Sequence, residues 1–239
     1  MNKKILVSLS VIAAVAALAI GGTIAYFSDV ETSTGNTFTA GSIDLKIDLD
    51  RDGVHVWDLK DLVAEADKFF NYTDVKPGDD GELTVSAHVY NNPAWGCFYV
   101  DPNVDSDVTC TEPELRPVDP DCLVVGPATT NGELDDYLIF RIWKDNGNNI
   151  WETGEPFMTY CGHTGLPGPE WCYLNDIDPA GEVWPLGKME GSTTYYFGVE
   201  WKLPSATGNI VQSDSWGSDV SFYVEQFKNN PGFVCPRTP

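Results

Sequence analysis

The chain has 239 residues, of which 36 are Asp or Glu and 14 are Lys or Arg, so its formal net charge is −22. This excess of acid argues against proteins that bind nucleic acids or anionic membrane surfaces, because both need clustered basic residues. Hydrophobic residues make up 42% of the chain and aromatic residues 12%, which is enough to fill the core of one domain.

The N-terminus has the features of an export signal. Lysines at positions 3 and 4 precede an apolar run from Ile5 to Ile20 and the small residues Thr23 and Ala25. This pattern predicts that a signal peptidase cleaves between Ala25 and Tyr26, and that the protein is secreted to the cell surface or the extracellular matrix. The alternative is a permanent membrane anchor, but the run is shorter than the roughly 20 residues that span a bilayer. We therefore expect membrane contact only through the signal peptide before cleavage.

Strand patterns follow along the rest of the chain. Apolar and polar residues alternate over 43–50 and 82–89, which predicts strands with one buried face. Runs rich in aromatic and β-branched residues, bounded by Gly, Pro, Asn and Asp, predict further strands at 95–100, 137–143, 195–203 and 220–227. We therefore expect an all-β fold, an antiparallel β-sandwich with one or two short helices.

Two segments depart from the strand pattern. From Asp58 to Phe70 the apolar residues recur at helical spacing, with Asp58 placed as an N-cap, which predicts a short amphipathic helix packed on the sandwich. The stretch at about 101–136 is rich in Pro and contains Cys but has little periodicity. We interpret it as an insertion loop stapled by disulfides rather than as a second domain.

The cysteines agree with export. All six follow the predicted signal peptide, and none is in a C-x-x-C pair; they are Cys97, Cys110, Cys122, Cys161, Cys172 and Cys235. We expect up to three disulfides, since free thiols are uncommon outside the cytosol. Six cysteines allow 15 connectivities, and the sequence does not choose among them. The most local candidate pair is Cys161 with Cys172, across a loop rich in Gly and Pro.

Two acidic clusters are weak candidates for calcium. Asp48, Asp50 and Asp52, followed by Gly53, match the first half of an EF-hand loop, but its twelfth position is Leu59 instead of Glu. The second cluster consists of Asp145, Asn149, Glu152 and Glu155 in a segment that resembles a hairpin turn. For both clusters a solvated acidic turn is the favoured interpretation, and bound calcium would make the loops rigid rather than catalyse a reaction.

Catalytic motifs are missing from the sequence. There is no H-E-x-x-H, G-x-S-x-G or P-loop, and the three histidines, His55, His88 and His163, lie in separate segments. We therefore predict no catalytic residue and no certain cofactor. The single sequon at Asn71 is a glycosylation candidate. Six tryptophans are candidates for a carbohydrate-binding face, although such residues more often fill a core: Trp143, Trp151, Trp171, Trp184, Trp201 and Trp216.

Three stretches, spread from end to end in order, carry a resemblance to a known family. They are residues 22–45 (GTIAYFSDVETSTGNTFTAGSIDL), 76–89 (KPGDDGELTVSAHV), and 210–215 with 219–230 (IVQSDS and DVSFYVEQFKNN). The first is similar to the signal-peptide junction and first strand of the TasA/camelysin family. The second resembles the family's strand after a Pro-Gly-Asp turn, and the third its C-terminal strand. The six cysteines and the Pro-rich insertion distinguish this chain from the simplest members.

This resemblance implies a jelly-roll protein, cleaved by a SipW-type signal peptidase, that forms homopolymeric fibres of a biofilm matrix. In such filaments the N-terminal strand of one subunit completes the sheet of the next. Here the donor would be Tyr26 to Leu45, with Phe27, Phe38, Ile43 and Leu45 filling sockets. The alternative, that this segment is an ordinary first strand of its own subunit, is nearly as well supported by sequence.

The implied organisation is a signal peptide at 1–25, an N-terminal segment and first strand at 26–45, and a jelly-roll sandwich at 46–239 that carries the insertion. The function we expect is that of a secreted structural subunit. A camelysin-like secreted metalloendopeptidase is the first alternative, because the family also carries that activity. A cell-surface carbohydrate-binding module is the second.

Overall fold

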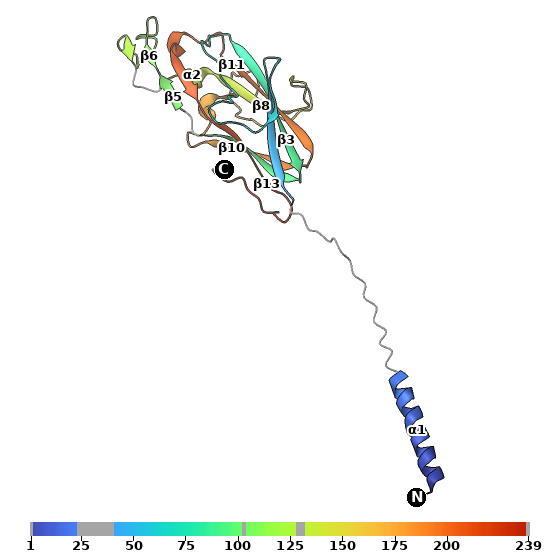
Figure 1. The fold of residues 1–239 in the computed structure, drawn as a ribbon. Coiled ribbons are helices and arrows are strands. Elements are labelled where there is room, and N and C mark those ends of the chain that lie inside the picture. The colour runs from blue at the N-terminus through green and yellow to red at the C-terminus, as the bar shows by residue number, and fades with distance from the viewer. Residues whose placement is uncertain (1, 23–40, 102–103, 128–131, 238–239) are drawn as a thin grey trace. The chain divides into compact units, whose positions relative to one another are not determined.

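The computed structural model describes residues 2–22, 41–101, 104–127 and 132–237 (Figure 1). The chain divides into two compact units, Met1–Ala40 and Gly41–Pro239. The described part of the first unit is a single helix, α1 (Lys3–Gly22). A search of the described residues finds no helix with the length and apolar character needed to cross a membrane.

The second unit is built almost entirely of antiparallel strands, so the prediction of an all-β fold is confirmed. Its long strands are β1 (Ile43–Arg51), β2 (Val54–Lys60), β3 (Asp80–Asn91), β4 (Ala94–Val100), β8 (Ile139–Asp145), β10 (Glu182–Met189), β11 (Thr193–Lys202) and β13 (Val220–Gln226). Its short strands are β5 (Val104–Asp107), β6 (Thr109–Cys110), β7 (Gly126–Pro127), β9 (Cys172–Tyr173) and β12 (Asp214–Gly217). The helical segments are α2 (Leu134–Tyr137) and two 3-10 turns, Leu174–Asp176 and Asn209–Val211.

Two sheets share one core. The larger has the strand order β2-β1-β3-β11-β8-β9, and the smaller has the order β10-β4-β13. Side chains alternate along each strand, so Leu83, Val85, Ala87 and Val89 of β3 point into the same core as Phe98 of β4. The two sheets therefore form an antiparallel sandwich; the jelly-roll connectivity stays a prediction.

The predicted helix from Asp58 to Phe70 is wrong. Asp52 and Gly53 both have positive φ, 49° and 71°, and form the two-residue turn of a hairpin between β1 and β2. This turn sends the chain back along β1, so Trp57 pairs with Leu49 and Lys60 with Ile47. Strand pairing thus overrides the helical spacing. Between Asp61 and Phe70 the chain makes a single turn, in which the amides of residues 66 and 67 bond to the carbonyl of residue 63.

The apolar residues of this segment serve as anchors instead. Phe69 is buried, with its ring 6.0 Å from that of Trp57 in β2 and 6.2 Å from that of Phe222 in β13. A second, smaller difference lies at Tyr137, which ends helix α2, so that the strand predicted to start there begins at Ile139.

The C-terminal segment, residues 227–237, covers the outer face of the smaller sheet. Trp95 Nε1 donates a hydrogen bond to the carbonyl of Asn230 (2.8 Å), and the Tyr99 hydroxyl donates one to the carbonyl of Pro236 (2.8 Å). A disulfide joins Cys97 to Cys235. This segment, which we call the C-terminal strap, explains why Cys97 and Tyr99 are buried although they point away from the core.

The other two disulfides are local. Cys161 pairs with Cys172, as the sequence favoured, and Cys110 pairs with Cys122 inside the predicted insertion. The insertion has little regular structure, since its described elements are β5, β6, β7 and the first residues of α2. A disulfide that closes a loop stabilises the fold chiefly by restricting the unfolded chain.

A close contact on the outer face of the larger sheet fixes the position of Trp143. Trp143 in β8 lies directly across from Gly198 in β11 and is 1% exposed. A Cβ atom on Gly198 would lie 2.1 Å from Cζ2 of the indole, so only glycine leaves room for this ring.

Replacement of Gly198 by Ala should therefore overpack this contact and lower the free energy of unfolding by about 1–3 kcal/mol. Gly208→Ala is the matched control, because nothing lies within 4 Å of a Cβ atom there and its φ is −85°. Urea denaturation of both variants measures the difference. Equal stability of the two variants would contradict the described packing of Trp143.

Candidate functional site

The three histidines do not share a site. His55, on β2, lies 2.7 Å from an Asp50 oxygen, and this hydrogen bond raises the pKa of the imidazole. His88, on β3, lies 2.7 Å from the hydroxyl of Thr194. His163 lies 2.9 Å from the carboxylate of Asp176. Each imidazole thus has a different partner, an arrangement unlike the clustered histidines of zinc peptidases.

The three aspartates of the first calcium candidate do not gather at one point, because Asp52 lies in the hairpin turn. Asp48 and Asp50 lie on the polar face of β1 and gather with His55. Asp52 is used elsewhere, since its carboxylate accepts hydrogen bonds from the amide of Glu82 (2.9 Å) and the hydroxyl of Tyr72 (3.2 Å). The EF-hand spacing therefore corresponds to a strand followed by an Asp-Gly turn.

The second calcium candidate is a loop closed by its own hydrogen bonds. Asp145 accepts from the amides of Gly147 (2.8 Å) and Asn149 (3.2 Å). Glu155 accepts from the amides of Asn146 (2.9 Å) and Glu152 (2.9 Å). Asn149 in turn bonds to Thr84 and Glu82 on β3. These carboxylates therefore bind the backbone of their own loop.

Several tryptophans of the proposed carbohydrate face are inside the protein. Trp143, Trp171 and Trp201 are 1%, 2% and 6% exposed. Trp143, Trp151 and Trp171, together with Phe157, surround the guanidinium of Arg141 at 4.8–5.7 Å from the ring centres. The same guanidinium pairs with Glu200 at 2.6 Å. These indoles therefore hold an internal cation.

The residues predicted to act in export and assembly fall in different parts of the chain. Ile43 and Leu45 lie in β1 and pair with Asn91 and Val89 of the same chain, so they belong to the subunit's own sheet. Ala25, Tyr26, Phe27 and Phe38 lie outside the described residues. Asn71, the glycosylation candidate, is exposed in the loop before β3.

The structure brings together a group of carboxylates that the sequence analysis did not single out. We call it the buried acidic cluster; it lies at one end of the sandwich, near β5 and β6 (Figure 1), and consists of Asp105, Asp107, Glu114, Asp119, Glu133 and Asp214. Asp107 in β5 is paired directly with Asp214 in β12. Glu114 and Asp119 come from the loop closed by the Cys110–Cys122 disulfide, and both are fully buried.

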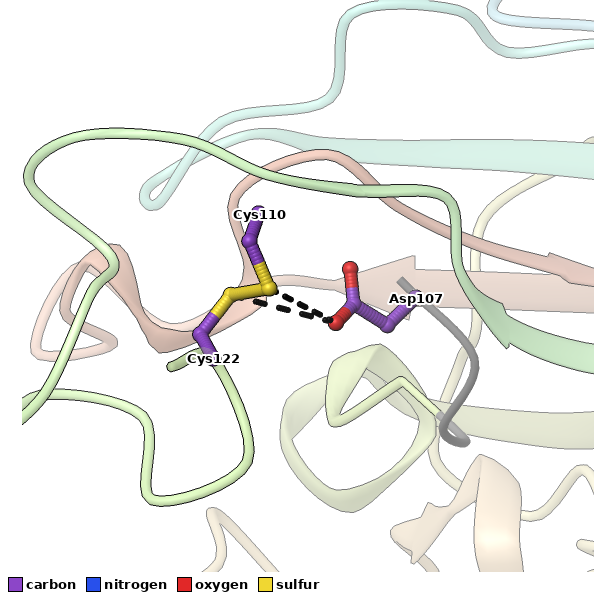
Figure 2. A group of neighbouring side chains, drawn as sticks. All are labelled: Asp107, Cys110 and Cys122. Atoms are coloured by element: carbon purple, nitrogen blue, oxygen red, sulfur yellow. Dashed lines mark hydrogen bonds between the residues drawn. A yellow bond between two sulfur atoms is a disulfide. The ribbon is translucent and has the colours of Figure 1, made fainter. Parts of the chain in front are cut away.

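The Asp107 carboxylate faces this disulfide (Figure 2). Its Oδ2 lies 3.7 Å from Sγ of Cys110 and 3.9 Å from Sγ of Cys122. Ligand oxygens of Asp107, Glu114 and Asp214 lie within 4.8 Å of one another. Two carboxylates at that separation repel by about 3 kcal/mol at an effective dielectric constant of about 20.

Burial and mutual repulsion raise the pKa of four acids in this cluster, Asp105, Glu114, Glu133 and Asp214. The pKa of Glu133 rises to about 8 because the group is desolvated and faces Asp119, Asp214, Asp107 and Asp121. Desolvation, with the charges of Asp107, Glu114 and Asp105, raises the pKa of Asp214 to about 7, although the Glu133 amide lowers it in part. Desolvation and the charges of Asp105 and Asp136 raise that of the neighbouring Asp135 to about 6.

A sequence signal for this cluster exists. Residues 101–136 contain ten Asp or Glu and a single basic residue, Arg116. The Arg116 side chain is directed to the carbonyl of Pro120, to which its Nε donates a hydrogen bond (2.5 Å). An acidic loop without basic partners is the pattern that indicates such a cluster.

The metal-free protein should therefore lose stability as the pH rises. A carboxyl whose pKa is higher in the folded than in the unfolded chain stabilises the fold below its unfolded pKa, and this contribution is lost as the pH passes the folded value. In the presence of a chelator, we expect the melting temperature to fall by several degrees as the pH rises from about 4.5 to about 8, and to change little from these groups above pH 8. Glu133→Gln, which cannot ionise, should flatten this slope, and Glu112→Gln in the same loop should not. If the melting temperature of Glu133→Gln falls with pH as steeply as that of the parent, the raised pKa of Glu133 is contradicted.

The comparisons with known proteins agree with the resemblance seen in the sequence. No curated protein matches the chain significantly. A family model described as camelysin metallo-endopeptidase matches residues 1–92, a stretch that runs from the first residue to the end of β3. Over these residues the chain is similar to the TasA/camelysin family.

Proposed function

We propose that the protein is a secreted structural subunit that assembles with copies of itself, residues 26–42 of one copy adding to the edge of a sheet in the next. The family match supports the proposal because it includes both this segment and the hairpin of β1 and β2. The three disulfides support secretion, since such bonds persist in oxidising compartments.

The observation that carries the proposal is the exposed edge of the larger sheet. Strand β2 is seven residues long and forms that edge, and its Val54 and Val56 are 64% and 41% exposed. An edge strand presents unpaired backbone groups, and exposed apolar side chains beside them favour the addition of another strand.

The other edges are less suited to accept a strand. At the far side of the larger sheet, β9 has two residues only. In the smaller sheet, β10 contains Pro185 and a register irregularity, and proline cannot donate to a ladder. Strand β13 remains a second acceptor candidate; the β2 edge is favoured by its exposed valines.

The donor has the necessary length. Residues 26–40 are 15 residues, which span about 50 Å when extended. Because Ile43 and Leu45 are already paired in β1, the donor is the segment before β1. The net charge of −22 opposes contact between subunits, so added salt or divalent cations should promote assembly.

Electron microscopy of the chain from Tyr26 tests this proposal. We expect ordered filaments, more abundant in added calcium or salt. Deletion of residues 26–40 should abolish the filaments because it removes the donor. The remaining Gly41–Pro239 should still fold, since it is a compact unit by itself. Val56→Lys should also abolish filaments, since it places a charge on the β2 edge. Val124→Lys, at a residue 74% exposed and far from β2 in sequence, is the matched control. Monodisperse monomers under all conditions would refute the proposal.

A metallo-endopeptidase is the second candidate, on the strength of the family model's description. The separate partners of His55, His88 and His163 weigh against it. We expect no cleavage of casein with or without added zinc. Chelator-sensitive cleavage that is lost when any one of the three histidines is replaced by Ala would establish the enzyme instead.

A further inference from the structure

Three carboxylates of the buried acidic cluster, those of Glu114, Asp119 and Asp214, each accept hydrogen bonds at one oxygen only. Glu114 accepts hydrogen bonds at Oε2, from the Thr111 amide (3.0 Å) and the Ser213 hydroxyl (3.3 Å), while its buried Oε1 has no partner. Asp119 accepts at Oδ1 from the Asp121 amide (2.7 Å), and its Oδ2 has no partner. Asp214 accepts at Oδ2 from the Glu133 amide (2.7 Å), and its Oδ1 has no partner.

This pattern points to a cation. Buried polar atoms are nearly always hydrogen-bonded, and a buried charge is paired or coordinates a metal. Here the oxygens that bond to N–H and O–H groups fix the carboxylates, and the opposite oxygens stay open. Glu114 and Asp119 are both 0% exposed, so bulk water does not reach their second carboxylate oxygens. Among the described residues, none of the ion pairs formed by a lysine, arginine or histidine includes Glu114, Asp119, Glu133 or Asp214.

The chemistry and spacing of the candidate ligand atoms favour calcium. All candidate ligands are carboxylate oxygens, because Cys110 and Cys122 are consumed in a disulfide and no histidine is part of the groups formed by Asp107, Glu114, Asp119 and Asp214. Calcium accepts six to eight oxygens at about 2.3–2.6 Å, so two oxygens on one ion lie at most about 5 Å apart. The ligand oxygens of Asp107, Glu114 and Asp214 satisfy this limit, since they lie within 4.8 Å of one another.

We propose that the buried acidic cluster is a calcium site in which Glu114, Asp214 and Asp107 bind the ion and Asp119 and Glu133 complete the carboxylate shell. The ion would neutralise acids from four parts of the chain: strand β5, the loop closed by Cys110–Cys122, the residue before α2, and strand β12. It would thereby fasten the insertion to the sandwich. The site is separate from the β2 edge and does not depend on self-assembly.

Calcium titration of the Gly41–Pro239 unit tests the proposal, because this unit lacks the proposed donor and its result is independent of filament formation. After treatment with a chelator, calorimetry should show about one calcium ion bound with a dissociation constant of about 1 mM or lower, and the melting temperature should rise with calcium. Absence of both effects up to about 10 mM calcium, or magnesium acting at equal or lower concentration, would overturn the proposal.

Variants locate the site. Glu114→Gln with Asp214→Asn keeps the shape of both side chains and removes two charges, so calcium affinity should fall by about tenfold or more while the melting temperature in chelator does not fall. Asp48→Asn with Asp50→Asn is the matched control and should bind calcium as the parent does. A calcium response that persists in the first variant, or disappears in the second, would refute the assignment.

A measurement on the parent chain covers the case in which the double variant fails to fold. Terbium replaces calcium at oxygen sites and emits when a nearby indole is excited. Trp216 in β12 pairs with Asp105 in β5, two residues from Asp214 and Asp107 respectively. We expect terbium emission that calcium displaces and that Trp216→Phe reduces at least twofold. Emission that calcium does not displace would count against the site.

Discussion

The pairing of β3 with β11 is the contact on which the rest of the sandwich depends. The two strands are in register over ten residue pairs, from Thr193 with Val89 to Lys202 with Asp80. One face of this pair supplies the centre of the core, and its two free edges receive β1 with β2 on one side and β8 with β9 on the other. This pair therefore positions the hairpin of β1 and β2, which leads to Phe69, and strand β8, which carries Trp143.

Local sequence patterns account for the strands but not for what lies between them. The alternation over 43–50 and 82–89 predicts β1 and β3 because one face of each strand packs into the core; the polar face of β3 is also covered, since Thr84 and Ser86 are buried. The failure at Asp58–Phe70 has a specific cause: Asp52-Gly53 is a strong hairpin turn, and the same residues also match the first half of a calcium loop. Once β2 is recognised as the return strand, Asp58 and Leu59 no longer support a helix.

The acidic cluster could not be predicted from spacing. Motif searches find ligands that lie close together in the chain, whereas Asp107 and Asp214 become neighbours only through the pairing of β5 with β12. A count of charges indicates that the 101–136 segment lacks basic partners, but burial decides whether such acids are solvated or confined. The same distinction separates this cluster from the Asp145–Glu155 loop, whose carboxylates are satisfied by backbone amides.

The disulfide between Cys97 and Cys235 also closes a covalent ring. The ring runs from β4 through the insertion to the C-terminal strap, and it encloses the Cys110–Cys122 and Cys161–Cys172 bridges. A single peptide-bond cut anywhere within the ring leaves the two fragments joined, and the buried core contacts hold them in place. For the secreted subunit proposed above, this topology turns an otherwise disruptive proteolytic cut into a tolerated nick.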